Sequence, residues 1–375
     1  MDTRVVIEDM ILNFTSILYE ALPFIVLGAI IAGILEEVVP QQFIARLVSG
    51  EYKPKNPLLR LIAAAFASFG TFPLLAISMC ALLGLIFPMC ECGIVPIMRR
   101  LLRKGLPLSC CVAYMLAGPI INPIVIASTF VAFVNHDNGI VIASMRLLMG
   151  FLIAVTTARL IEGMYRKHGS KLIHESARPT PPKQSISLGL ASQPAPEGTT
   201  SGESAAAPAA ASAAPAAPKR SLRQRLGNIS ETALHDFVDI TMFLVLGAML
   251  ATIAQMFIFS PDSIRDLSVS FPILTILTMM VLAVVLCLCS EADAFVAASF
   301  TTMAPSGKLA FLVLGPMVDI KLLFLFTRVF APRLIATMVL AVVVQVFVYC
   351  VVLHFVWQAV VSYLIATPSN ITSGG

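Results

Sequence analysis

Residues 334–365 read LIATMVLAVVVQVFVYCVVLHFVWQAVVSYLI, without one Asp, Glu, Lys or Arg. A helix needs about 20 apolar residues to cross the roughly 30 Å hydrocarbon core of a bilayer, so this run is long enough to span a membrane. Across the 375 residues, 58% are hydrophobic and 12% are charged, and the mean hydropathy is +0.90. A soluble domain carries about 25% charged residues. The sequence therefore predicts an integral membrane protein.

Similar apolar runs recur along the chain and predict an all-α polytopic membrane protein. We expect eight spans, near residues 11–35, 73–89, 107–133, 139–161, 234–259, 271–288, 309–330 and 334–365. The apolar stretch 61–72 is too short to cross alone, and a re-entrant or an interfacial segment would both fit it. Basic loops flank both ends of the second span, which leaves open whether the two halves of the chain are parallel or inverted.

The segment 163–228 is rich in Ala, Pro, Ser and Gly and cannot bury enough apolar surface to offset its ordering entropy. We expect a disordered linker between a first membrane repeat, 1–162, and a second, 229–375. Its ends are basic, and the positive-inside rule places it in the cytoplasm of a cell with a bacterial-type inner membrane.

The net charge of +4 does not indicate nucleic acid. The Lys and Arg residues lie in short loops between apolar runs, where they set the orientation of the spans. We therefore expect the lipid bilayer, and no nucleic acid, as a partner.

An internal repeat is the sharpest pattern in the chain. One set of residues lies around a Gly-Pro step in the first half, and a matching set recurs at the same spacing in the second half. The first set is Cys90, Cys92, Gly118, Pro119 and Asn122, and the second is Cys287, Cys289, Gly315, Pro316 and Asp319. At another offset, Leu27–Ala29 matches Leu246–Ala248, which places Glu20 opposite Asp239. Duplication of this kind is typical of transporters, whose halves move about a shared site.

The paired cysteines are candidate ligands. An isolated membrane Cys is usually a small apolar filler, and we assign Cys80 and Cys350 to that class, whereas the adjacent Cys110 and Cys111 stay undecided. Residues two apart on a regular helix point about 200° apart, but Pro88 and Gly93 bracket the first C-x-C pair and should break its helix. The Gly-Pro steps should likewise interrupt the third and seventh spans, and broken helices at membrane depth line cavities.

Charged side chains within spans mark functional positions, because each costs at least about 2.5 kcal/mol at the bilayer centre unless it is paired or wetted. For the matched Glu20 and Asp239 we expect proton coupling or cation binding. Asp319 and Lys321 either neutralise each other, lie near the water interface or act in the pore, and His235 fits an interfacial residue that caps the start of its helix. Glu91, Asp236, Glu291 and Asp293 complete the set.

Thiolates select soft and borderline cations such as Cu(I) and Zn(II), and trivalent arsenic is also thiophilic. Two converging C-x-C pairs would offer two to four sulfurs, with Glu91 or Glu291 nearby. The sequence has no G-x-x-x-x-G-K-[ST] phosphate-binding loop, so we expect secondary transport of the ion as substrate, without a cofactor.

Residues 88–96, PMCECGIVP, followed by 116–123, LAGPIINP, resemble the bacterial predicted-permease family that includes the methylarsenite permeases. The long central linker and 287–293, CLCSEAD, are similar to a branch assigned to copper and zinc efflux. The resemblance covers nearly the whole chain outside the linker. It implies export of a toxic metal or metalloid, with Cys90, Cys92, Cys287 and Cys289 as ligands. The linker has two His residues near its start and no Cys, so it offers no metal-gathering segment.

Two other classes of function fit the paired thiols. A C-x-C pair can cycle as a strained disulfide in a membrane thiol oxidoreductase, and a sensor or assembly subunit can bind metal without moving it. We favour a permease, which is not an enzyme. A homo-oligomer or an unseen partner subunit remains open.

Overall fold

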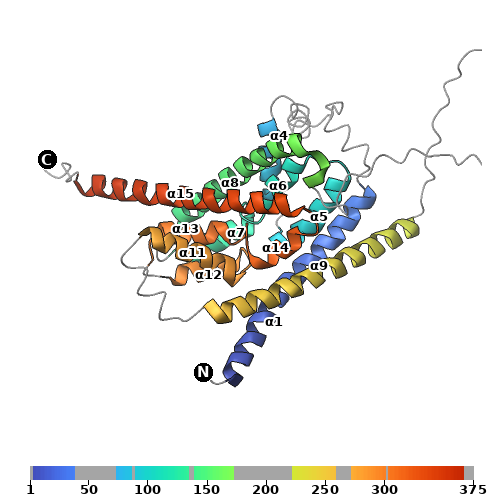
Figure 1. Cartoon of the computed structure of the whole chain (residues 1–375), viewed down its shortest axis with the longest axis horizontal. Coiled ribbons are helices and arrows are strands. Elements are labelled where there is room, and N and C mark those ends of the chain that lie inside the picture. The colour runs from blue at the N-terminus through green and yellow to red at the C-terminus, as the bar shows by residue number, and fades with distance from the viewer. Residues whose placement is uncertain are drawn as a thin grey trace, which may run out of the picture.

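The computed structural model describes residues 3–38, 73–86, 89–134, 139–172, 222–258, 272–300 and 303–366, which form helices joined by turns, with no β-strand among them. In chain order the elements are α1 Thr3–Val38, α4 Pro73–Leu82, η2 Leu83–Leu85, α5 Glu91–Arg103, α6 Leu108–Ala117, α7 Pro123–Phe133, α8 Gly139–His168, η3 Gly169–Leu172, α9 Leu222–Ile258, α11 Pro272–Leu286, α12 Ala292–Ser299, α13 Pro305–Leu314, α14 Ile320–Phe326 and α15 Pro332–Ala366 (Figure 1).

Four helices of the described chain, α1, α8, α9 and α15, are long and apolar enough to cross a membrane. α15 shows why: Met338, Val342 and Val346 are buried, whereas Leu340 and Val344 are exposed. Both stripes are apolar, so one face packs on the protein and the other suits lipid. The chain is therefore an all-α polytopic membrane protein, as its composition predicted.

Eight spans were expected, the third and the seventh of them interrupted at their Gly-Pro steps. Segments 73–85, 108–117, 123–133, 273–286 and 305–314 are helices too short to cross a bilayer as regular single spans. The predicted third span is divided between α6 and α7 by residues 118–122, and the seventh between α13 and α14 by residues 315–319. The interruptions expected at the two Gly-Pro steps are confirmed.

The ends of the predicted linker are helical. α8 continues to His168, and α9 already begins at Leu222, so helices extend past both bounds of the 163–228 segment. His235 consequently lies well inside α9, and the expectation that it caps the start of its helix is wrong. Residues 173–221 and the short stretch 61–72 lie outside the described residues.

Helix bounds in the two halves recur at fixed offsets. α6 and α13 begin 197 positions apart and end 197 positions apart, the offset that joins Cys90 to Cys287. α1 and α9 begin 219 positions apart, the offset that joins Gly28 to Gly247. The division of the chain into two repeats stays a prediction.

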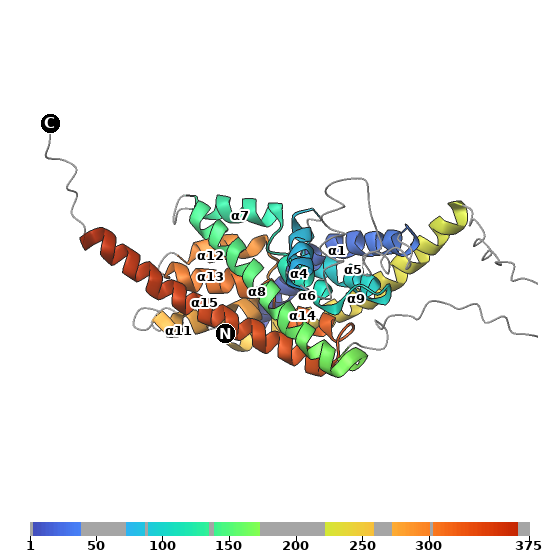
Figure 2. The same ribbon diagram turned by 90° about the horizontal axis from the view of Figure 1, so that it is seen from above.

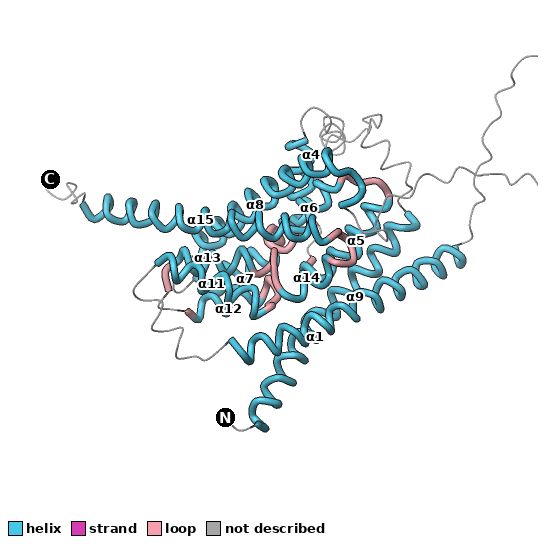
Figure 3. The backbone as a smooth tube through the Cα atoms, viewed as in Figure 1, coloured by secondary structure: helices cyan, strands magenta, loops and turns pink. Residues whose placement is uncertain are grey.

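Helices of the first half pack directly against helices of the second half. α1 packs along α9, α7 packs against α12, and α14 packs against α5 and α9 (Figures 1 and 2). Glycines permit the closest approaches. A Cβ at Gly28 would collide with the carbonyl group of Gly93 on α5, and a Cβ at Gly247 would lie 2.8 Å from the Cα of Lys321 on α14. Loops that interrupt the helices gather near the middle of the molecule (Figure 3).

The interior is unusual for its charged side chains. Arg146, Lys308 and Lys321 are among the largest fully buried side chains of the described residues. Lys308 lies 5.6 Å from the ring centroid of Phe133, a cation–π distance. The other two buried cations meet carboxylates and free carbonyl groups at the interrupted helices.

Candidate functional site

The candidate site is built around the unwound segment between α11 and α12, residues 287–291. Cys287 has φ of 51°, a left-handed conformation that costs a non-glycine residue roughly 1–2 kcal/mol. This conformation stops the helix and leaves carbonyl groups without intrahelical donors. At membrane depth such groups need partners from the protein, and two buried cations supply them.

Lys321, in the first turn of α14, meets this segment from the side. Its Nζ donates to the carbonyl oxygen of Cys287 at 3.0 Å and to that of Leu288 at 3.3 Å. The same nitrogen lies 3.9 Å from Cys289 Sγ. The ammonium group therefore ties α14 to the free end of α11.

Two carboxylates neutralise Lys321. Its Nζ lies 3.0 Å from Glu91 Oε1 and 3.3 Å from Asp319 Oδ2, and all three side chains are at most 2% exposed. The Glu91 contact is an ion pair outside hydrogen-bond geometry, and Glu91 Oε2 has no hydrogen-bond partner among the described residues. The expected neutralisation between Asp319 and Lys321 is confirmed, with Glu91 as a second counter-ion.

Asp319 and Asn122 occupy equivalent positions after the two Gly-Pro breaks. Asp319 Oδ1 accepts from the backbone N–H of Leu322 at 2.6 Å and caps α14, while Asn122 Oδ1 accepts from Ile124 at 2.9 Å and caps α7. Both side chains are fully buried. These caps explain why the chain resumes a helix after each break.

One of the four predicted ligand cysteines, Cys90, contacts two of the others. The thiol of Cys90, the residue before α5, is in hydrogen-bonding contact with those of Cys92 and Cys289. All three are buried. α5 begins at Glu91, so Cys92 and Gly93 are already helical, and the break expected between Pro88 and Gly93 ends earlier, at Cys90. Cys90 is the extended residue before the helix, and its thiol contacts both Cys92 in the first turn and Cys289 of the other half.

Cys287 faces elsewhere. Its Sγ donates to the carbonyl oxygen of Val284 at 3.3 Å and faces the backbone N–H groups of Ile320 and Lys321. The structure thus brings together sulfurs from both halves, but it separates Cys287 from the other three thiols.

Arg146 forms a second buried charge cluster beside the first. Its guanidinium donates to Thr129 Oγ1 at 2.8 Å and to the carbonyl oxygen of Ser290 at 3.1 Å, and it lies 3.9 Å from Asp293 Oδ2. A Cβ at Gly315 would lie 3.0 Å from that same oxygen, so the Gly-Pro break leaves space for Asp293. The sequence analysis missed Arg146, although an arginine in the middle of an apolar run is itself a signal.

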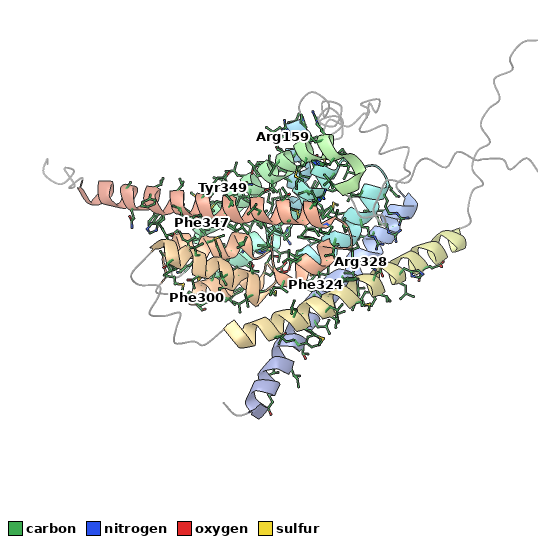
Figure 4. All side chains as sticks on the ribbon, viewed as in Figure 1. Arg159, Phe300, Phe324, Arg328, Phe347 and Tyr349 are labelled. Carbon is green, nitrogen blue, oxygen red and sulfur yellow. The ribbon has the colours of Figure 1, made fainter. Side chains whose placement is uncertain are left out.

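The remaining candidates are more peripheral. Glu291 is half-buried and accepts a hydrogen bond from Ser290 Oγ at 3.3 Å. Asp239 on α9 is 39% exposed and pairs with Arg99 at 3.3 Å and with Arg328 at 2.7 Å. Arg328 lies where the chain after α14 approaches α9 (Figure 4). Asp239 therefore joins three elements at the edge of the core, while the side chain of Glu20 lies outside the described residues.

The described side chains do not form a ready metal centre. Within the described ranges, no three His, Cys, Asp or Glu side chains are placed to hold a metal ion. The Nζ of Lys321 instead lies among the carboxylates and carbonyl oxygens that a cation would use. The site therefore already holds a tethered positive charge.

The sequence of the chain matches a known protein family. The family described as Predicted permease matches residues 72–355, which include every element of the site. The chain belongs to this family. The permease is 34% identical to the UPF0718 protein YcgR of Bacillus subtilis (strain 168) over 344 residues, which cover 89% of this chain and 92% of the relative.

A second relative comes from Streptococcus mutans serotype c (strain ATCC 700610 / UA159). It is 32% identical over 340 residues, covering 90% of this chain and 93% of the relative, and has the working description of a two-component membrane permease complex subunit. No solved structure matches the permease.

Proposed function

We propose that this membrane permease exports a thiophilic metal or metalloid, zinc, copper or a trivalent arsenical, through the site between its two halves. One observation carries the proposal: the thiol of Cys90, which also contacts that of Cys92, contacts that of Cys289 across the boundary between the halves. Sulfur ligands select soft and borderline cations. A site made jointly by two moving halves can open when they separate.

Lys321 gives the proposed site a means of release. Its ammonium group is held by Glu91, Asp319 and two carbonyl oxygens. An entering cation competes with this ammonium for the same carboxylates, because two positive charges in one desolvated site repel each other strongly. Binding then requires Lys321 to move away, and its return expels the cation.

The expected setting follows from the same arguments. We place the permease in the inner membrane with its linker in the cytoplasm, driven by an ion gradient as a secondary transporter. The description of the Streptococcus mutans relative as a subunit supports a second protein in the working complex.

Transport by purified permease in liposomes tests the proposal. We expect accumulation of zinc, copper(I) or arsenite to depend on the permease and to fall at least tenfold in the Cys90→Ser and Cys289→Ser variants. Cys350→Ser is the matched control, because Cys350 is equally buried but lies on α15. Unchanged transport in both site variants would reject the proposed site.

The same contact supports a second candidate function. Adjacent thiols of Cys90 and Cys289 could cycle as a disulfide in a membrane thiol oxidoreductase. Membership of a permease family favours a transporter. Alkylation of the reduced and oxidised permease separates the two functions, since an oxidoreductase must show labelling of these cysteines that changes with redox state.

A further inference from the structure

A second group of sulfur atoms lies in the first half of the permease, apart from the proposed site. Cys80 of α4 and Cys110 of α6 are in hydrogen-bonding contact, and both are at most 1% exposed. Two helices therefore place two thiols against each other, which single apolar fillers would not require.

The paired thiols line a cavity. It measures about 110 Å³ and is bordered by Cys80, Cys110, Met98 and Tyr114, together with apolar side chains of α1, α5 and η2. A water molecule occupies about 30 Å³ in the liquid, so the space is ample for one ion. Cys111, next in sequence and equally buried, does not border it.

α5 connects this cavity with the site already described. Cys92 lies in the first turn of α5 and Met98 follows six residues later, about 9 Å along a helix. Two further residues border the cavity: Leu101, within the basic segment 99–104, and Leu106, just after it. The cavity thus lies between the central thiols and the basic end of α5.

We propose that Cys80, Cys110 and Met98 form a second binding site, for a soft monovalent metal cation held by two thiolates and a thioether. Sulfur donors of this kind select Cu(I) over hard cations. Two sulfurs suffice for such an ion, so the site needs no cluster of three Cys, His or carboxylate ligands. Because the cavity lies along α5, this second site would hold the ion between the central site and the basic end of the helix. That role in transport rests on the proposed function.

Silver(I), a soft monovalent cation that is not readily reduced or oxidised by the protein under anaerobic conditions, is the probe. Purified full-length permease is loaded with Ag⁺, freed of excess by gel filtration, and analysed for silver per chain. Relative to wild type, we expect the Cys80→Ser/Cys110→Ser variant to lose about one equivalent. Cys111→Ser, the control from the same helix, keeps the wild-type amount.

Met98→Leu provides a second measurement that conserves side-chain volume. We expect it to keep the stoichiometry and to weaken Ag⁺ binding at the cavity by about tenfold, measured by competition with a soluble thiol. Wild-type stoichiometry in the Cys80→Ser/Cys110→Ser variant, or, should that variant not fold, wild-type affinity in Met98→Leu, overturns the second site.

The central site is tested separately by Cys90→Ser/Cys289→Ser. If this variant also loses about one equivalent of silver relative to wild type, both sites are supported. If it binds as much silver as wild type while the Cys80→Ser/Cys110→Ser variant does not, the proposed transport site fails and the second site stands.

Discussion

Lys321 and Glu91 form an ion pair that is almost completely withdrawn from solvent, with side-chain exposures of 0% and 2%. Removing one partner of such a pair leaves an uncompensated charge, which costs about 3–5 kcal/mol, whereas removing both costs much less. We therefore expect Lys321→Met and Glu91→Gln each to lower the unfolding temperature in detergent. The double variant should be more stable than the sum of the two effects predicts. Strict additivity would show that the two charges do not interact.

Arg146 permits a second test at this scale, because the same helix supplies its control. Arg146 is buried and joins α8 to Thr129 and Ser290, whereas Arg159 on α8 is exposed (Figure 4). We expect Arg146→Gln to lower the unfolding temperature strongly and to reduce transport, because it leaves Asp293 unpaired. Arg159→Gln should change stability by less than about 0.5 kcal/mol. Equal effects of the two substitutions would contradict a structural role for Arg146.

The backbone at Cys287 gives a third prediction. Its left-handed conformation favours glycine, and its thiol lies apart from the other three. Cys287→Gly should therefore be about 1 kcal/mol more stable than Cys287→Ala, by thermal unfolding of the two variants side by side. Both variants should retain transport, in contrast to Cys90→Ser. Loss of transport in both would return Cys287 to the ligand set.

Among the elements, α9 and α14 lie close enough that the packing tolerates no side chain at Gly247. A Cβ there would lie 2.8 Å from the Cα of Lys321, so Gly247→Ala must push α14 away and disturb the ammonium group. We expect lower stability and reduced transport. Gly227→Ala on the same helix meets nothing within 4 Å and should be neutral or stabilising, because alanine favours a helix by about 1 kcal/mol over glycine. Thermal unfolding of both variants in detergent measures this difference in stability.

For the whole molecule, the helix contacts between the halves predict that the halves assemble without a covalent link. We expect fragments 1–200 and 201–375 to purify together when co-expressed, because α1 packs along α9 and α7 packs against α12. Mild oxidation with diamide should join the fragments through Cys90 and Cys289, detected on a non-reducing gel. Cys90→Ser in the first fragment is the control. Separate elution of the fragments would contradict this account.

The sequence correctly predicted the membrane class and the breaks at the Gly-Pro steps. It also predicted that cysteines of the two halves approach one another and that Asp319 neutralises Lys321. Each rests on a local property: hydropathy over about 20 residues, the missing N–H of proline, or a recurring spacing. The prediction that Gly93 breaks the helix was wrong, because Gly93 lies within α5. There it packs closely against Gly28 of α1, a contact that the local sequence pattern does not reveal. The sequence also did not predict that α4 and α11, within the second and sixth expected spans, are short helices.

The sequence by itself determined that this chain is a helical membrane protein with interrupted helices, because those properties depend on neighbours along the chain. Only the tertiary structure decided that Cys90 contacts Cys289 while Cys287 contacts backbone groups, and that Lys321 lies between Glu91 and Asp319. The physical reason is that a side chain's direction in an unwound segment depends on φ and ψ at each residue. Those angles are set by which carbonyl groups the opposite half can satisfy.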